Sequence, residues 1–320
     1  MADGQGYNAW LGYGVESTLG TLVTRTLFND FISESLRLNS DRKQWNNAGG
    51  TSQRINTELG RFSEGGFECY GDFQSHVTLF KHAFGASSVT SVQLSASSAY
   101  SHTYALKSAL PSPGLSVEIN RDVTSFLYEG CKVEEVEFTQ PPNDYLHVRF
   151  GIIGRNETQA SASSPSFLSP LKVHSSQLVC EVGDAAITID SFRLLLKNNL
   201  TGFRPQLGSA DSKEFVRANK RSVSGEVTLS FANVTRYDEF RAVTNIKLEF
   251  NYTGDTIPSG AGNAYTFNLL MPQINWSGDT PPVSGSGPML LTLPFMAFET
   301  TRFGEDELSL VVKNALTSVT

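Results

Sequence analysis

The sequence has few of the residues, and none of the motifs, on which most enzymes depend. Its 320 residues include only three cysteines and five histidines, without a Cys-x-x-Cys pair or an HxH, HExxH or HxxxH motif. There is no GxxxxGK[ST] loop for phosphate and no GxSxG nucleophile turn. We therefore expect no catalytic residue, no cofactor and no metal site, and predict that the chain is not an enzyme.

Strong net charge and long apolar runs are also missing. Lys and Arg number 25 against 32 Asp and Glu, so the net charge is −7 and no basic surface for gripping nucleic acid is expected. No 18 apolar residues run together, so we expect no membrane-spanning helix. The first residues, MADGQGYNAW, lack the basic and apolar parts of a secretion signal. The odd number of cysteines fits buried free thiols in a reducing cytoplasm.

What the sequence does contain is typical of a mainly β protein. Phe, Val, Ser, Thr and 27 Gly are common. Residues 115–119, 146–152 and 223–231 alternate apolar and polar side chains, which predicts strands with one buried face. Two segments, 75–84 and 234–240, change to helical spacing. For the first we predict Ser75 as the N-cap and Gly85 as the end.

The order of these elements occurs twice. Gly65 and Gly225 lie 160 residues apart, and at the same offset Arg61 falls on Arg221. Strand, long polar stretch, strand and helix then recur in one order. A rival alignment pairs Tyr104 with Tyr265 but breaks this order. The repeat predicts two tandem β-sandwich domains, each with one flanking α-helix. The predicted parts are an N-terminal arm (1–31), a first domain (32–155), a Ser/Pro-rich linker (156–176) and a second domain (177–320).

The arm is too hydrophobic for a free tail and too irregular for an amphipathic helix. It contains Tyr7, Trp10 and Tyr13 among several glycines. Two interpretations stay open, which are a terminal strand docked on its own domain and a contact with another subunit.

The two polar stretches, 39–60 and 198–219, are longer than ordinary connections. Such loops in compact domains are usually functional or disordered. Because aromatic and Arg side chains are enriched at interface hot spots, we predict assembly contacts here. The candidates are Trp45, Arg54, Phe203, Arg204, Phe215 and Arg217. The alternative is two hairpin tips without a role.

Carboxylates alternate with apolar residues on one predicted strand. Glu135 and Glu137 share a face opposite Val136 and Phe138. This is typical of a strand that faces water or a channel, and it favours that interpretation over a pair of catalytic carboxylates.

The motifs together resemble the major tail tube proteins of long-tailed bacteriophages. The resemblance lies in GYGVESTLGT (12–21), GRFSEGGFECYGDFQSHVTLFKHAFG (60–85) and KRSVSGEVTLSFANVTRYDEF (220–240), and it extends over nearly the whole chain. The Ser-rich insertion at 86–101 departs from the simplest members of that family.

This resemblance implies a structural protein of the virion, made in the host cytoplasm. Inner sheets of neighbouring subunits would join into a barrel around a DNA channel, and the rings would stack into a tube. Single-domain members form hexameric rings, so two domains per chain imply a homotrimeric pseudo-hexamer. Implied partners are the tape-measure, baseplate and tail-terminator proteins, with DNA only passing through and no membrane.

An acidic lining would repel DNA phosphates, and we predict that it includes Asp72, Glu135, Glu137, Asp190 and Glu226. The alternative function is a baseplate or adhesive carbohydrate-binding β-sandwich. That function would need an exposed aromatic platform, and the three Trp residues are scattered in the sequence.

Overall fold

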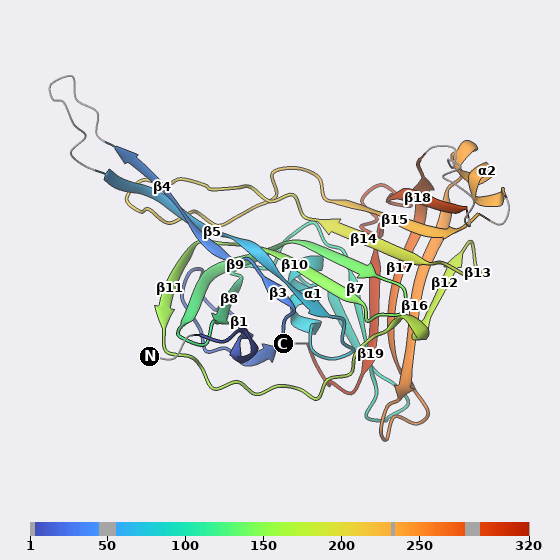
Figure 1. Cartoon of the computed structure of the whole chain (residues 1–320), viewed down its shortest axis with the longest axis horizontal. Coiled ribbons are helices and arrows are strands. Elements are labelled where there is room, and N and C mark those ends of the chain that lie inside the picture. Colours follow the sequence, from blue (N-terminus) through green and yellow to red (C-terminus); the bar gives the residue numbers. More distant parts are fainter. Residues whose placement is uncertain (1–3, 45–55, 232–233, 279–288, 320) are drawn as a thin grey trace.

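The chain folds into an elongated, mainly β structure (Figure 1). The computed structural model describes residues 4–44, 56–231, 234–278 and 289–319. Within these ranges lie 19 strands, the helices α1 (Val77–Phe84) and α2 (Thr235–Arg241), and the short 3-10 turns η1 (Gly6–Asn8) and η2 (Ser175–Gln177). The predicted fold class, mainly β with a sandwich arrangement, is confirmed.

One long antiparallel sheet runs through both halves of the chain. Its strands are adjacent in the order β4 (Arg37–Gln44), β5 (Asn56–Tyr70), β10 (His147–Gly154), β9 (Ser125–Gln140), β14 (Ser191–Lys197), β15 (Ser222–Ser230) and β18 (Leu290–Ala297). The halves meet where β14 pairs with β9, from Phe192 opposite Gln140 to Lys197 opposite Glu135. Side chains alternate between an apolar and a polar face along β9, β14, β15 and β18, as expected for a sheet buried on one side.

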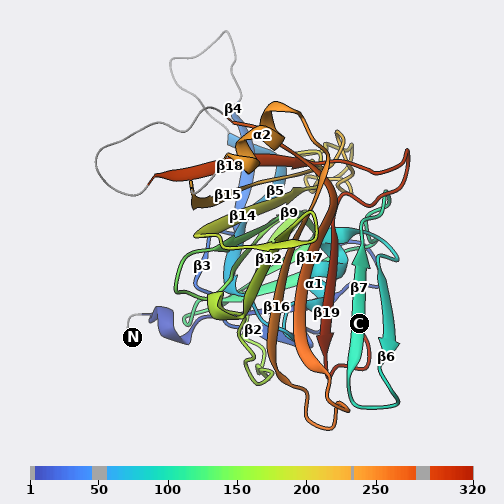
Figure 2. The same ribbon diagram turned by 90° about the vertical axis from the view of Figure 1, so that its right-hand side faces the viewer.

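Two smaller sheets complete the structure. The first contains β2 (Leu27–Asn29), β1 (Trp10–Val15), β8 (Leu115–Asn120), the first part of β9, and β11 (Asn156–Ala160). The second contains β12 (Leu178–Val182), β16 (Ile246–Thr256), β17 (Ala264–Trp276), β19 (Ser309–Asn314), β7 (Tyr100–Ala105) and β6 (Val89–Gln93), side by side in Figure 2. The short strands β3 (Ser33–Glu34) and β13 (Ala185–Ile187) pair with β5 and β12.

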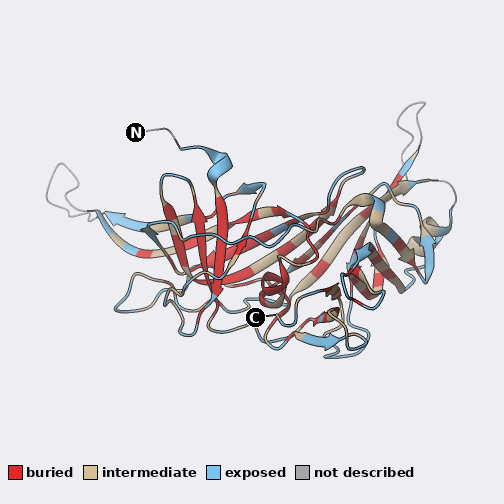
Figure 3. Ribbon diagram, turned by 90° about the horizontal axis from the view of Figure 1, so that it is seen from below, coloured by how far each residue is buried: buried red, intermediate tan, exposed pale blue. Residues whose placement is uncertain are grey.

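Helix α1 lies in the core that these sheets enclose. The Phe80 ring contacts Phe138, Phe150 and Phe267 at centroid distances of 5.8, 5.5 and 5.8 Å. These rings come from β9, β10 and β17, so strands from both halves bury side chains against one helix. The buried residues form a continuous cluster along the molecule (Figure 3).

The ends of α1 differ in how well the sequence predicts them. Gly85 ends the helix, as predicted, with φ of 128°, a value that favours glycine. Ser75 does not cap the helix. Instead the Asp72 carboxylate accepts hydrogen bonds from the amides of Gln74 and Ser75, at 2.8 and 3.0 Å, and fixes the turn before the helix.

Part of the first polar stretch, 39–60, is strand rather than loop. Strand β4 continues to Gln44 and β5 begins at Asn56, and the two pair with each other as a projecting hairpin (Figure 1). A two-stranded ribbon exposed on both faces satisfies its backbone without any apolar alternation, so the sequence pattern gives no strand signal.

The arm pairs as one of its two interpretations predicted, whereas the predicted linker and the Ser-rich insertion pair in ways that the sequence did not predict. The arm docks through β1, with Leu11 and Tyr13 fully buried, which agrees with the first of the two interpretations. The first five residues of the predicted linker form β11, which pairs with β9. The Ser-rich insertion forms β6 and the start of β7, and β7 pairs with β19 of the second half.

The three cysteines, Cys69, Cys131 and Cys180, are buried free thiols, as predicted. Burial raises the pKa of both Cys69 and Cys180 to about 12. They are therefore protonated and unreactive at neutral pH.

Replacing Phe80 with Ala should lower the free energy of unfolding by about 3–5 kcal/mol, because it empties a fully buried site that both halves share. Phe240→Ala, the counterpart on α2, is the matched control, since that side chain is only partly buried. Urea unfolding followed by tryptophan fluorescence measures both. Equal losses for the two variants would contradict a core centred on α1.

Candidate functional site

The polar face of the long sheet is the most extensive candidate surface. Cross-strand neighbours place charged side chains from six strands on it. They are the carboxylates of Glu64, Glu68, Glu135, Glu137 and Glu226 and the cations of Arg37, Arg149, Arg193 and Lys197. Five negative and four positive charges give a mixed, slightly acidic surface.

Ion pairs organise the centre of this face. Glu137 accepts two hydrogen bonds from Arg193, at 2.7 and 3.1 Å, in the bidentate arrangement typical of Arg and carboxylate. Glu135 lies between Arg149, at 2.5 Å, and Lys197, at 3.5 Å. Because Arg193 and Lys197 belong to β14, these pairs cross the joint between the two halves.

The hydrogen bonds from Arg193 lower the pKa of the Glu137 carboxyl below its ordinary value. The same carboxylate raises the pKa of Arg193, to which Glu226 adds a smaller contribution. Both groups therefore stay charged across the physiological pH range.

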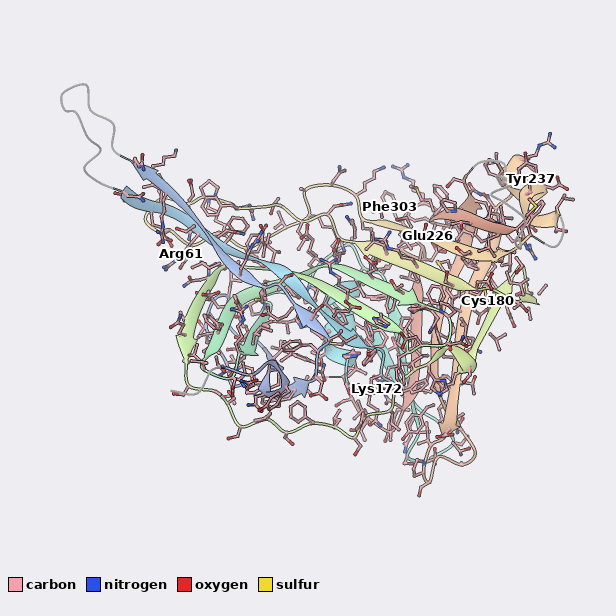
Figure 4. The ribbon with its side chains drawn as sticks, in the orientation of Figure 1. Arg61, Lys172, Cys180, Glu226, Tyr237 and Phe303 are labelled. Carbon is pink, nitrogen blue, oxygen red and sulfur yellow. The ribbon has the colours of Figure 1, made fainter. Side chains whose placement is uncertain are left out.

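The other predicted acids lie in different environments. Glu226, labelled in Figure 4, is on the same face, and the pairing of β14 with β15 places it directly opposite Arg193. Asp190 is exposed immediately before β14. Asp72 is buried, and besides the turn before α1 its carboxylate accepts the Leu171 amide at 2.8 Å, so it is not brought to this face.

The second polar stretch, 198–219, is a loop that packs against the first half of the chain. Phe215 is buried in a small cluster with Ile153 and Leu200. Phe203 stacks on Phe62 of β5 at a centroid distance of 5.9 Å.

Arginines fix the base of this loop. The Arg217 guanidinium donates to the Lys107 carbonyl at 3.0 Å and to the Asn198 side chain at 2.8 Å, and Arg204 donates to the Glu214 carbonyl. All four candidates predicted in this loop thus make contacts within the chain. Trp45 and Arg54 lie outside the described residues.

The charged residues that hold this loop in place were not predicted from the sequence. Arg61 of β5 pairs with Asp211 at 2.6 Å, and the almost fully buried Lys132 of β9 pairs with Glu214 at 2.7 Å. Arg61 is part of the internal repeat, but its offset from Arg221 indicates only a repeated position and not a binding partner. The spacing of single charges along a strand does not indicate a partner 150 residues away.

Two possible sites for other chemistry are not supported. Trp10 and Trp276 are buried, so neither offers an exposed platform for a sugar. Among the described residues, no group of three His, Cys, Asp or Glu side chains is placed to hold a metal ion. In the same ranges, no helix is long and apolar enough to cross a membrane.

Glu137→Gln should destabilise the protein near neutral pH by about 1 kcal/mol or less, the usual range for a partly exposed ion pair. A depressed carboxyl pKa contributes stability above the unfolded-state value of 4.5, and this stability is lost as pH falls through the lower native value. The difference between wild type and variant should therefore shrink by about pH 3.

Urea unfolding at both pH values measures this difference. Glu64→Gln is the matched control, because Glu64 lies 3.9 Å from Arg37 and is half exposed. A Glu137 effect that grows in acid would contradict the assigned ion pair.

Comparison with known protein families identifies the family of this chain. The model of the family described as phage tail tube protein matches residues 6–297. No curated protein sequence matches the chain. Since the match extends over most of the chain, this protein belongs to the phage tail tube family and is a structural component of the virion.

Proposed function

We propose that three copies of the chain close into a ring in which the long sheets join around a channel. Such rings would stack into the tail tube, through which DNA passes into the host. The polar face of the long sheet would line the channel, and the chain would have no catalytic role. The observation that carries the proposal is the continuity of this sheet across both halves.

Strand pairing supports the view that each chain contributes two equivalent units. In the first half the adjacent strands are β4, β5, β10, β9, β8 and β1. In the second half they are β14, β15, β18, β17, β16 and β12, in the same relative order. A helix follows the second strand of both series. This match favours the strand-order alignment. The first unit then includes β1 of the predicted arm in addition to the predicted domain 32–155, and the second unit corresponds to 177–320 after the 156–176 connection.

The joint between β9 and β14 supplies a template for the joint between chains. Strand β4 occupies in the first unit the place of β14 in the second, and in the described residues β4 pairs only with β5. Leu36, which precedes β4, has its carbonyl occupied by hydrogen bonds from Arg121 at 2.7 Å and from Tyr128 at 2.9 Å, so the available edge begins at Leu38. An open edge of this kind invites pairing, and ring closure would remove it.

The charge of the polar face supports passage of DNA without capture. Arg193 is paired with Glu137, and Arg149 and Lys197 share Glu135. A mildly acidic lining repels phosphates and offers no cluster of free cations to hold them. Glu135, Glu137 and Glu226 would line the channel directly.

Other tail components would meet the ends of the tube, as proposed partners. These are the tape-measure, baseplate and tail-terminator proteins. The subunit would be made in the host cytoplasm before assembly. Trp45 and Arg54 remain candidates for contacts between subunits.

Purified full-length chain tests the proposal by negative-stain microscopy and native mass spectrometry. We expect rings or tubes, with a smallest ring of three chains. Six chains per ring would contradict the proposal that each chain supplies two of the six units. Chains that stay monomeric under all polymerising conditions would contradict the proposal that the protein forms a tube.

Leu38→Pro tests the proposed edge. The Leu36 carbonyl points away from β5, and backbone groups two residues apart on a strand point the same way, so proline at position 38 removes an amide on the open edge. We expect a folded subunit that fails to form rings. Leu38→Ala is the matched control, since it shortens the side chain but keeps the amide. Normal rings from the proline variant would show that β4 is not the joining strand.

A further inference from the structure

A groove opens beside the end of the long sheet in the second half. It has a volume of about 960 Å³ and lies between β15, the end of β18 and the segment 298–308. Three large apolar side chains line it while remaining accessible. Met296 is 49% exposed, Phe298 39% and Phe303 77%. Arg302 and Lys220 also line the groove.

Phe303 is unusual in its backbone as well as in its exposure. Its φ is 64°, a left-handed value that a bulky side chain rarely adopts and that costs of the order of 1 kcal/mol or more. The ring is mostly exposed, and among the described residues its contact is with the Arg302 guanidinium, 4.8 Å from the ring centroid. Arg61 lies on β5, one of the two strands of the projecting hairpin, and Figure 4 shows it well apart from Phe303.

The equivalent place in the first half is covered. Gly65 and Gly225 are equivalent positions in the two halves. Gly65 pairs with Ile152 and Gly225 with Phe295, so the residues that follow these partners, Ile153 and Met296, are equivalent as well. Ile153 is only 4% exposed because Leu200 and Phe215 of the loop 198–219 pack on it. The loop that follows β14 thus seals the first half at the position where the second half has its groove.

The counterpart of that loop is the connection that follows β4, which is the β4–β5 hairpin. In Figure 1 the described strands of this hairpin, β4 and the start of β5, point away from β18 of the same chain. The same hairpin from a second copy can reach the groove if the two copies are joined as the two halves are joined within one chain. The first half of the second copy would then lie beside the second half of this chain.

We propose that the groove at Met296, Phe298 and Phe303 receives the β4–β5 hairpin of a second copy of the chain in the same ring. The inference rests on the two-unit ring proposed above and names its contact surface. Each chain then presents one hairpin and one groove. Such head-to-tail contacts close on themselves after three copies.

Site-directed cross-linking tests the contact directly. Arg42 is exposed on the described part of the hairpin, so we would join Arg42→Cys to Met296→Cys with a short bis-maleimide in the full-length protein. The native cysteines are buried and should not react. We expect covalent dimers and trimers on a denaturing gel. Arg42→Cys with Val92→Cys, which is 54% exposed on β6, is the control and should give monomers.

The other outcomes would overturn the inference in distinguishable ways. Tubes that assemble but yield only monomers on the gel would mean that another partner fills the groove, while the proposed function stands. A ladder that continues beyond trimers would place the contact between rings. Wild type that never assembles would contradict the inference and the proposed function together.

Two substitutions give an independent measurement. Met296→Glu with Phe303→Asn should leave the thermal midpoint of the monomer unchanged, because both side chains are exposed and asparagine tolerates the left-handed backbone. Ring formation should be lost. Val123→Glu, at a site 75% exposed in the first half, is the control and should assemble normally. Unimpaired rings from the double variant would contradict the proposed groove contact.

Discussion

The pairing of β9 with β14 is the interaction on which the rest of the structure depends. It joins a strand of the first half to a strand of the second through six residue pairs, and it makes one sheet from two. Its apolar side is buried against α1 and the second sheet, and its polar side carries ion pairs such as Arg193 with Glu137. Loss of this pairing would divide the core and expose two sheet edges.

The same joint gives related segments different surroundings. In the second half, β14 is paired on both sides and the loop after it is packed against Ile153. In the first half, β4 is paired on one side, and the hairpin after it projects from the body (Figure 1). One chain therefore contains one complete joint, the pairing of β9 with β14. It also presents the open edge of β4 and its hairpin, from which a second joint of the same kind could form with another chain. That asymmetry is what a subunit of a closed ring requires.

The sequence predicted the parts of this fold that local physics determines. Strands with one buried face, such as Leu146–Ile152, alternate visibly, and Gly85 marks the end of α1. The polar hairpin gave no such signal, since neither of its faces is buried. Pairing partners could not be predicted either, as when β7 joins β19 across the chain. Nor does spacing tell that Asp72 turns inward to bind backbone amides whereas Glu137 stays on the sheet face.

Amide hydrogen exchange of the monomeric chain, followed by mass spectrometry, tests the central claim most directly. If β9 and β14 join the two halves into one sheet, amides in residues 135–140 and 192–197 should exchange as slowly as those of the β10 core strand. Protection should be lost in both segments together on global unfolding. Fast exchange of these two segments beside a protected β10 would mean that the halves fold as separate units, and would contradict the account.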